Sequence, residues 1–486
     1  MKQTEGLNNK AKKRAQRVYS IFVATVSFAF LAAMAVSCAG LTPAVNRVVS
    51  ERFVVGVNVY PVEAVWACYE VTPEEKWMYY GWELGNNREI CVKAEQYDSV
   101  GHIIFSPDLS RFAYGAIEHH KYFVVVDGIE GKRYDETRGC VFSPDSKRVA
   151  YIAREGRKQF VVVDGTEGRQ YDDIGDLVFS PDSKRVAYTA EVGNKCFVVV
   201  DGIEGKQYRA LGEQISKVAP IFSPDSQQVG YVAREGRKAF VVVDGIEGKH
   251  YDGIGPGIGC YSTAPVFSPD SQWVAYVAEV GNKQFVVVDG VEGKQYDGIK
   301  ASSLIFSPDS QRVAYKAEVG NKCFVVVDGI EGKQYDGMGR GTLIFSPDSK
   351  RVAYGAYLGD RGFVVVDGIE GKQYDAIGDL IFSPDSKRIA YGAQAGDKRF
   401  VVVDGIEGKQ YDDIGAPIFS PDSQRVGYAA EIGDKCFVVV DGIEGKQYDA
   451  IKDIRERIIF DSPDSLHYLA AKGNSLYLVE ETIIPR

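Results

Sequence analysis

The chain has 486 residues, of which 45% are hydrophobic and 12% aromatic, so it can bury large cores and is too long for one small domain. Its formal net charge is −10, and because residues 1–37 carry six basic side chains and one acidic one, the remainder carries −15. A body this acidic, with no basic stripe and no RNA-binding signature, excludes nucleic acid as an expected partner.

Residues 1–37 predict an export signal. Basic residues from Lys10 to Arg17 precede an uncharged, strongly apolar segment at 21–36, and small residues follow it. The sequence Ala35-Val-Ser-Cys38 resembles the lipobox of bacterial lipoproteins, in which Cys38 would be the lipidated first residue. We therefore expect an exported protein, either a periplasmic or outer-surface lipoprotein or a secreted one. A membrane anchor that is retained is the third alternative.

Residues 38–61 are expected to form a linker and a ring-closing strand. The segment 52–60 is apolar and partly alternating, which favours a strand. If the repeats that follow form a ring, this strand could complete the last sheet. Neither end of the chain would then leave an unpaired strand edge exposed. Residues 77–100, which end in Gln96-Tyr-Asp98, resemble a worn copy of the repeat.

One sequence unit then recurs nine times, and this repetition predicts the fold more strongly than any other feature. Each unit opens on the phrase Phe-Ser-Pro-Asp, and successive copies lie 37 to 45 residues apart. The opening phenylalanines are Phe105, Phe142, Phe179, Phe222, Phe267, Phe306, Phe345, Phe382 and Phe419. A tenth, degraded copy starts at Phe460.

Each unit predicts four short antiparallel strands, which in the seventh copy are residues 343–346, 351–356, 363–366 and 373–377. The first turn, Ser346-Pro-Asp-Ser349, has the residue order of a type I turn. The run Phe363-Val-Val-Val366 is apolar throughout, which indicates burial on both faces of the sheet. The segment from Asp367 to Gly371 turns the chain before the fourth strand. Such a unit is stable only when neighbours stack on it.

The recurring phrases Phe345-Ser-Pro-Asp348, Val352-Ala-Tyr354 and Val364-Val-Val-Asp-Gly368 resemble the WD40-like (PD40) repeat of TolB-type β-propellers. This repeat is also seen in propeller domains of the prolyl oligopeptidase and dipeptidyl peptidase families. The resemblance implies an all-β propeller that presents a surface to a protein partner at the cell envelope. That family often has glycine after Ser-Pro-Asp, whereas serine stands there in this chain. We expect the turn to close without a left-handed residue.

The number of repeats is about ten to eleven, whereas ordinary propellers have about four to eight blades. We therefore favour two propellers in tandem, with a boundary in the widest spacing, so that 62–259 hold the first set of repeats and 260–486 the second. A single, unusually broad ring is the alternative.

Motifs for catalysis, metal binding and cofactors are missing. The sequence has no Gly-x-Ser-x-Gly, no His-Glu-x-x-His and no phosphate-binding loop. The recurring aspartates, such as Asp145, Asp164 and Asp172, are interpreted as turn residues that bond to backbone amides. Cysteines 196, 323 and 436 occupy one position in three separate repeats, which predicts free thiols. We expect no enzyme activity, no metal and no small-molecule cofactor.

The loops that differ between repeats are the candidate binding surface. In an antiparallel meander the hairpins between second and third strands emerge on one face together with the links between units, and these vary most in sequence. The candidate partner-binding residues are His119, His120, Arg154, Arg157, Arg234, Arg237, Tyr261, Tyr357 and Arg361. The alternative is a carbohydrate- or peptide-binding, or hydrolytic, propeller with its site at the ring axis.

Overall fold

The computed structural model describes residues 46–61, 88–92, 97–209, 220–255, 265–300, 303–339, 342–451, 458–473 and 475–484. The export segment, Cys38, Tyr261 and most of residues 62–96 lie outside these ranges. Residues Val45–Arg486 form one compact unit.

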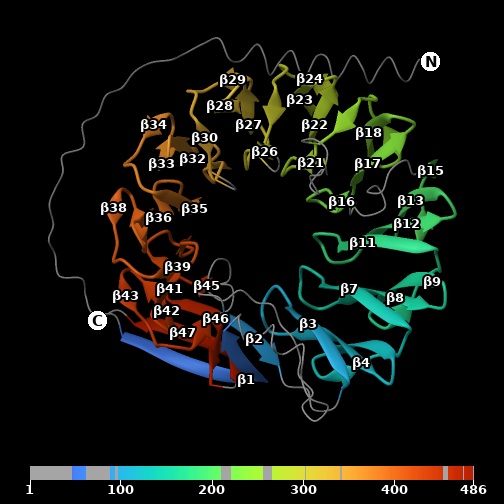
Figure 1. Ribbon diagram of the computed structural model, residues 1–486, viewed down its shortest axis with the longest axis horizontal. Helices are drawn as coiled ribbons and strands as arrows, with labels where there is room; N and C mark the ends of the chain where they lie inside the picture. The colour runs from blue at the N-terminus through green and yellow to red at the C-terminus, as the bar shows by residue number, and fades with distance from the viewer. Residues whose placement is uncertain are drawn as a thin grey trace. The chain divides into compact units, whose positions relative to one another are not determined.

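The described residues form ten antiparallel sheets and no helix, so nothing among them could span a membrane as a helix. The sheets follow one another in chain order around a closed circuit (Figure 1). We number them blades 1–10 by their second strands. These are β4 (Phe112–Glu118), β8 (Val149–Glu155), β12 (Val186–Val192), β17 (Val229–Glu235), β22 (Val274–Val280), β27 (Val313–Val319), β32 (Val352–Leu358), β36 (Ile389–Ala395), β41 (Val426–Ile432) and β46 (Ser465–Lys472).

The first strand of each blade lies nearest the centre of the circuit (Figure 1). In blades 1, 2, 3 and 8 it is continuous, as β3 (Ser99–Phe105), β7 (Glu136–Phe142), β11 (Asp173–Phe179) and β35 (Ala376–Phe382). In blade 4 it is β16 (Ile221–Phe222). In the other blades it is split in two: β20 (Gly253–Ile254) and β21 (Val266–Phe267), β25 (Gly298–Ile299) and β26 (Ile305–Phe306), β30 (Gly337–Met338) and β31 (Ile344–Phe345), β39 (Asp413–Ile414) and β40 (Ile418–Phe419), β44 (Ala450–Ile451) and β45 (Ile459–Ser462).

The third strands of blades 1–9 carry the Phe-Val-Val-Val run, which is buried on both faces as predicted, for example in Phe363 to Val365. They are β5 (Lys121–Val126), β9 (Lys158–Val163), β13 (Lys195–Val200), β18 (Lys238–Val243), β23 (Lys283–Val288), β28 (Lys322–Val327), β33 (Arg361–Val366), β37 (Lys398–Val403), β42 (Lys435–Val440) and, in blade 10, β47 (Ser475–Ile484). A short extra strand, β15 (Tyr208–Arg209), also pairs with β13.

The fourth strands are only two residues long, which corrects the prediction of a strand at 373–377. They are β6 (Ile129–Glu130), β10 (Thr166–Glu167), β14 (Ile203–Glu204), β19 (Ile246–Glu247), β24 (Val291–Glu292), β29 (Ile330–Glu331), β34 (Ile369–Glu370), β38 (Ile406–Glu407) and β43 (Ile443–Glu444). The reason is the turn: Asp367 and Gly368 both have positive φ, at 51° and 82°, as a two-residue type I′ hairpin requires. Ile369 therefore pairs at once with Val366, and Ala376 already belongs to the next blade.

Serine in a left-handed conformation closes the Ser-Pro-Asp-Ser turn, which corrects a second prediction. Ser349 has a φ of 64°, and its equivalents from Ser146 to Ser423 have values between 60° and 67°. The serine hydroxyl accepts a hydrogen bond from the preceding blade, for instance from the backbone N–H of Asp309 at 2.8 Å. This contact between blades gives serine a role that glycine could not fill.

A separate hydrophobic cluster joins each blade to the next. Between blades 8 and 9, for example, Ala390 and Val401 of blade 8 pack with Tyr428 and Phe437 of blade 9. Tyr411, which lies between the two blades in the chain, belongs to the same cluster. The cluster between blades 4 and 5 includes Val241 and Tyr276, so it crosses the predicted boundary at 259/260. The last cluster packs Leu469 and Leu476 of blade 10 against Tyr114 and Phe123 of blade 1, which closes the circuit.

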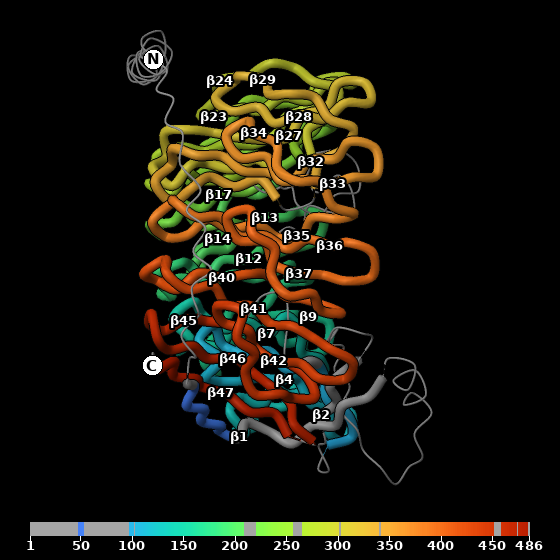
Figure 2. The backbone as a smooth tube through the Cα atoms, turned by 90° about the vertical axis from the view of Figure 1, so that its left-hand side faces the viewer, coloured from blue at the N-terminus to red at the C-terminus, as the bar shows by residue number. Residues whose placement is uncertain are grey.

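The N-terminal strand β1 (Asn46–Pro61) completes blade 10, as expected of a ring-closing strand. It pairs with β47, with Ser50 opposite Glu480, and Figure 2 shows the two strands side by side. The strand β2 (Arg88–Val92) pairs with the far end of β1. The described residues are therefore one ten-bladed β-propeller, and the favoured arrangement of two tandem propellers is corrected to the single broad ring. The wide spacing before Phe267 reflects a longer link between two blades.

Candidate interaction face

The recurring aspartates of the Ser-Pro-Asp-Ser turns are used by the fold, as the sequence indicated. In the seventh copy the carboxylate of Asp348 accepts hydrogen bonds from the Ser346 hydroxyl at 2.6 Å and from the Lys350 N–H at 3.2 Å. The bond from Ser346 is the main reason that the pKa of Asp348 lies below its usual range. Among the described residues, no group of three or more His, Cys, Asp or Glu side chains could hold a metal ion.

An arginine follows seven of the nine Phe-Ser-Pro-Asp turns and joins two blades, whereas Gln228 and Trp273 stand at this position in blades 4 and 5. The Nε atom of Arg351 pairs with Asp367 of the Asp-Gly turn at 2.9 Å, and its Nη1 atom donates to the Ser386 carbonyl of the next blade at 3.3 Å. Its guanidinium also lies 5.1 Å from the centre of the Phe382 ring. The arginines on the face that carries these turns are therefore engaged in structural contacts.

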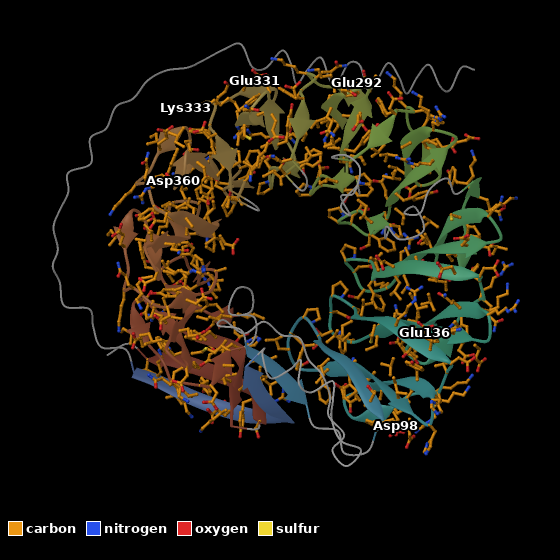
Figure 3. The ribbon with its side chains drawn as sticks, in the orientation of Figure 1. Asp98, Glu136, Glu292, Glu331, Lys333 and Asp360 are labelled. Carbon is orange, nitrogen blue, oxygen red and sulfur yellow. The ribbon has the colours of Figure 1, made fainter. Side chains whose placement is uncertain are left out.

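Glutamates of the fourth strands make the outermost contacts between blades. Glu292 accepts from Lys249 and Glu331 from Lys294, both at 2.6 Å, and both glutamates lie at the outer side of the circuit (Figure 3). Where the neighbouring tyrosine hydroxyl is also close, it joins the pair, as Tyr251 does with Glu292 at 3.0 Å.

The aspartate of each Tyr-Asp pair holds a hairpin on the opposite face. The carboxylate of Asp375 accepts the Gly396 N–H of the β36–β37 hairpin at 2.7 Å and pairs with Arg361 of the preceding blade. Arg361, a candidate for partner binding, thus already has a partner within the protein. Because all blades share one strand order, the hairpins between second and third strands lie at the same end of the blades.

The other candidate residues are spread over several hairpins of this end, which we call the hairpin face. His119 and His120 are exposed and have φ values of 50° and 61° in the β4–β5 hairpin. Arg154 pairs with Glu136 at 2.7 Å, and Arg157 is exposed in the same hairpin. The structure does not gather the candidates into one cluster.

The remaining candidates differ in their surroundings. Arg234 is half-buried and Arg237 exposed in the β17–β18 hairpin. The Tyr357 ring is half-buried and lies against Gly362, where an added Cβ atom would come within 2.8 Å of it. The predictions for Tyr261 and Cys38 lie outside the described residues.

A pocket that the sequence did not reveal lies between the inner strands of blades 8 and 9. Its volume is about 410 Å³, and its lining includes Gly378, Asp379, Gly392, Gly415 and Tyr357. A register shift between Ile377 and Leu380 leaves Gly378 and Asp379 outside the regular strand pairing. The signal in the sequence was three glycines in separate segments, which only the fold brings together.

Cys196, Cys323 and Cys436 are in no disulfide bond, as predicted. All three are buried, and burial is the main cause that raises the pKa of Cys196 and of Cys323 to about 11. These two thiols are therefore protonated and poorly reactive at neutral pH.

Comparisons with known proteins do not assign this chain to a family. No protein-family model matches the chain, and no curated protein matches it. Similar solved structures include a eukaryotic initiation factor, with 14% identity, a TM-score of 0.41 and coverage of 74% of this chain and 96% of that one. They also include the β-propeller domain of the Trilobed protease from Pyrococcus furiosus (14%, TM-score 0.27, 54% and 91%) and the Dos1 propeller (11%, 0.33, 71% and 91%). The resemblance to TolB-type repeats remains a resemblance.

Proposed function

We propose that this chain is a non-enzymatic propeller, exported to the cell envelope or secreted, that presents its hairpin face to a protein partner. The observation that carries the proposal is a difference in bonding and sequence variation between the two faces of the ring. The turns on one face bond to each other and to the next blade, as Arg351 does with Asp367 and Ser386. The hairpins on the other face vary in sequence and carry exposed side chains such as His120, Arg157 and Arg237.

The test is a fourfold substitution of Arg154, Arg157, Arg234 and Arg237 by alanine. We expect it to weaken capture of the partner from envelope extract at least tenfold and to leave thermal stability nearly unchanged, because exposed ion pairs contribute about 0–1 kcal/mol. The matched control replaces four exposed lysines of the opposite turns with alanine, which are Lys147, Lys184, Lys350 and Lys387. Equal capture by the two variants would contradict the proposal.

The proposed location depends on residues 1–38. A lipid on Cys38 or a retained apolar segment would hold the propeller at a membrane, whereas cleavage without lipidation would release it. Mass spectrometry of the mature N-terminus distinguishes these outcomes. An N-terminus at Met1 in the cytoplasmic fraction would contradict export.

A second candidate function is binding of a carbohydrate or peptide near the ring axis. The pocket between blades 8 and 9 favours it, because its lining combines the Tyr357 ring with the polar groups of Asp379 and Gln394. Hydrolysis would need a carboxylate pair or an activated nucleophile, and the recurring carboxylates are bonded within the fold, as Asp348 and Asp375 illustrate.

A further inference from the structure

The repeats allow the space between neighbouring blades to be compared around the ring. The space lies between the first two strands of one blade and the first strand of the next. Two positions face it, one in the first strand and one in the second. In blade 8 they are Gly378 and Gly392, which lie so close that a Cβ atom added to Gly378 would be 3.5 Å from the Gly392 Cα atom.

Between blades 2 and 3 an arginine crosses this space, with its side chain 41% exposed. Arg138 stands where blade 8 has Gly378, since both lie four residues after the Tyr of the Tyr-Asp pair. Its Nη2 atom donates to the Ile174 carbonyl at 2.5 Å and to Gln159 Oε1 at 2.9 Å, and it lies 3.3 Å from an Asp173 carboxylate oxygen.

Between blades 6 and 7 a lysine fills the same space from the other position. Lys316 stands where blade 8 has Gly392, in the third residue after the valine or isoleucine that opens the second strand. It is only 3% exposed, and its Nζ atom donates to the Gly339 carbonyl at 2.5 Å. Between blades 7 and 8, where both positions are glycine, Thr342 occupies the space and its hydroxyl accepts the Gly355 N–H at 3.0 Å.

Between blades 8 and 9 no side chain of these positions fills the space, and a pocket results. The residues that match the carbonyl acceptors of Arg138 and Lys316 are Ile414 and Gly415, and both line the pocket. Asp379 lies at the pocket, exposed, and makes no hydrogen bond or ion pair with the described residues. The other charged lining residue, Arg399, is already neutralised by Asp413.

We propose that this pocket binds a guanidinium or ammonium group carried on an aliphatic chain, in the place that Arg138 and Lys316 take elsewhere in the ring. The carbonyl groups of Ile414 and Gly415 would accept its hydrogen bonds, and Asp379 would supply the opposite charge. The Tyr357 ring forms an apolar wall beside which the aliphatic stem can pack, and its face attracts a cation. The net charge of −15 outside the export segment also favours a cationic ligand. The proposal is independent of the hairpin-face function.

The double glycine alone does not define the pocket. Blade 1 also has glycine at both positions, Gly101 and Gly115, but there the next blade presents Thr137 and Arg138 where blade 9 has Ile414 and Gly415. The site therefore needs both the glycines of blade 8 and the Ile414-Gly415 wall of blade 9.

The experiment is calorimetric titration of the purified protein with N-acetyl-arginine methylamide. The matched negative ligand is the citrulline compound, which has nearly the same shape and no charge. We expect binding of the arginine compound and at least tenfold weaker binding of the citrulline compound. Equal affinities, or no binding of either compound, would overturn the proposal.

Two pairs of variants test the location. Gly392→Lys should fill the pocket from within, as Lys316 does in blade 6, and abolish binding, whereas Gly392→Ala should keep it. A Cβ on Gly392 would lie 3.4 Å from the Ile414 Cδ1 atom, so alanine is accommodated there, and the rest of a lysine side chain would extend into the pocket. Asp379→Asn should weaken binding about tenfold, and Asp176→Asn, at the aligned position of blade 3, should not. Retained binding by Gly392→Lys would refute the site.

A further arm distinguishes the source of the cation. A neutral peptide with one central arginine is compared with the blocked amino acid and with free arginine. Tighter binding of the peptide identifies a polypeptide ligand, and equal or tighter binding of free arginine identifies a small molecule. Partner capture through the hairpin face is measured on Gly392→Lys in parallel, so the failure of one proposal is not mistaken for the failure of the other.

Discussion

The serine that ends each Ser-Pro-Asp-Ser turn carries two opposing contributions to stability. Its positive φ is a conformation that glycine adopts at lower cost. Its hydroxyl, however, accepts a backbone N–H from the preceding blade, at 2.8 to 3.1 Å from blade 1 through to blade 9. The sequence could not reveal this role, because the donor and the serine lie in different repeats.

Substitution of Ser386 separates the two contributions. Ser386→Ala should lower the free energy of unfolding by about 1–2 kcal/mol, because it leaves the Asp348 N–H without its acceptor and keeps a side chain at a φ of 65°. Ser386→Gly loses the same bond but relieves the backbone, so it should cost less by about 0.5–1 kcal/mol. Denaturant titration of both variants measures the difference. A glycine variant less stable than the alanine variant would contradict this explanation.

Lys316 should make the free energy of unfolding rise with pH above about 8. Burial lowers the pKa of its ammonium group to about 8, whereas the unfolded chain has a lysine pKa of about 10.4. Below pH 8 both states bind the proton, and the folded state bears the full cost of a buried charge. As the pH rises from about 8 towards 10.4, the folded state loses its proton first, so this group makes folding more favourable.

The variant Lys316→Met should therefore be more stable than the natural protein by about 1 kcal/mol at pH 7, and this advantage should shrink as the pH rises above 8. Stability curves at several pH values between 7 and 9.5 test the expectation. The control is Lys350→Met, since Lys350 is highly exposed and should show no such trend. A stability advantage of Lys316→Met that grows with pH would contradict this explanation.

At the scale of elements, β1 depends on a buried ion pair to hold it in blade 10. Arg47 pairs with Glu481 of β47 at 2.9 Å, and its guanidinium also donates to the Val438 and Ile443 carbonyls of blade 9. The Tyr468 hydroxyl donates a hydrogen bond to the other oxygen of Glu481 at 2.5 Å. Glu481 is fully buried, so loss of its charge would leave an uncompensated guanidinium.

Glu481→Gln should consequently loosen the closure. We expect the free energy of local opening to fall by about 3 kcal/mol in β1 and β47, seen as faster amide hydrogen exchange there and unchanged exchange in β32 and β33. Glu480→Gln is the control, because Glu480 is exposed on the same strand. Equal changes of amide exchange in all blades would argue against a local effect of the Arg47–Glu481 ion pair on β1 and β47.

Most elements followed from the sequence, and the exceptions have local causes. The buried Val-Val-Val strands and the first turns were predictable because apolar runs and Ser-Pro-Asp act within a few residues. The fourth strand was misplaced because the Asp-Gly turn reverses the chain within two residues, so the pairing belongs to Ile369 and Glu370. The polar Lys-Gln-Tyr-Asp segment leads into the next blade.

At the scale of the whole molecule, the sequence predicted blades but not how many share one ring. Ring size depends on the small angle between neighbouring sheets, added over all of them, and no single repeat reveals that angle. The wide spacing before Phe267 was misleading, because a longer link leaves the packing between blades 4 and 5 intact. The pocket was missed for a related reason, since Gly415 comes to lie beside Gly378 and Gly392 only when blades 8 and 9 pack.

Closure of one ten-bladed ring by the N-terminal strand is tested most directly by a disulfide across the β1–β47 pair. Ser50 lies opposite Glu480 in this pairing, so cysteines at both positions should be within the roughly 7 Å that a disulfide allows. A positive control places cysteines at Ser465 and Thr482, which pair within one hairpin. Under mild oxidation, mass spectrometry of the double variant Ser50→Cys/Glu480→Cys should show the cross-linked peptide in most molecules. A control that cross-links while positions 50 and 480 do not would contradict the single closed ring.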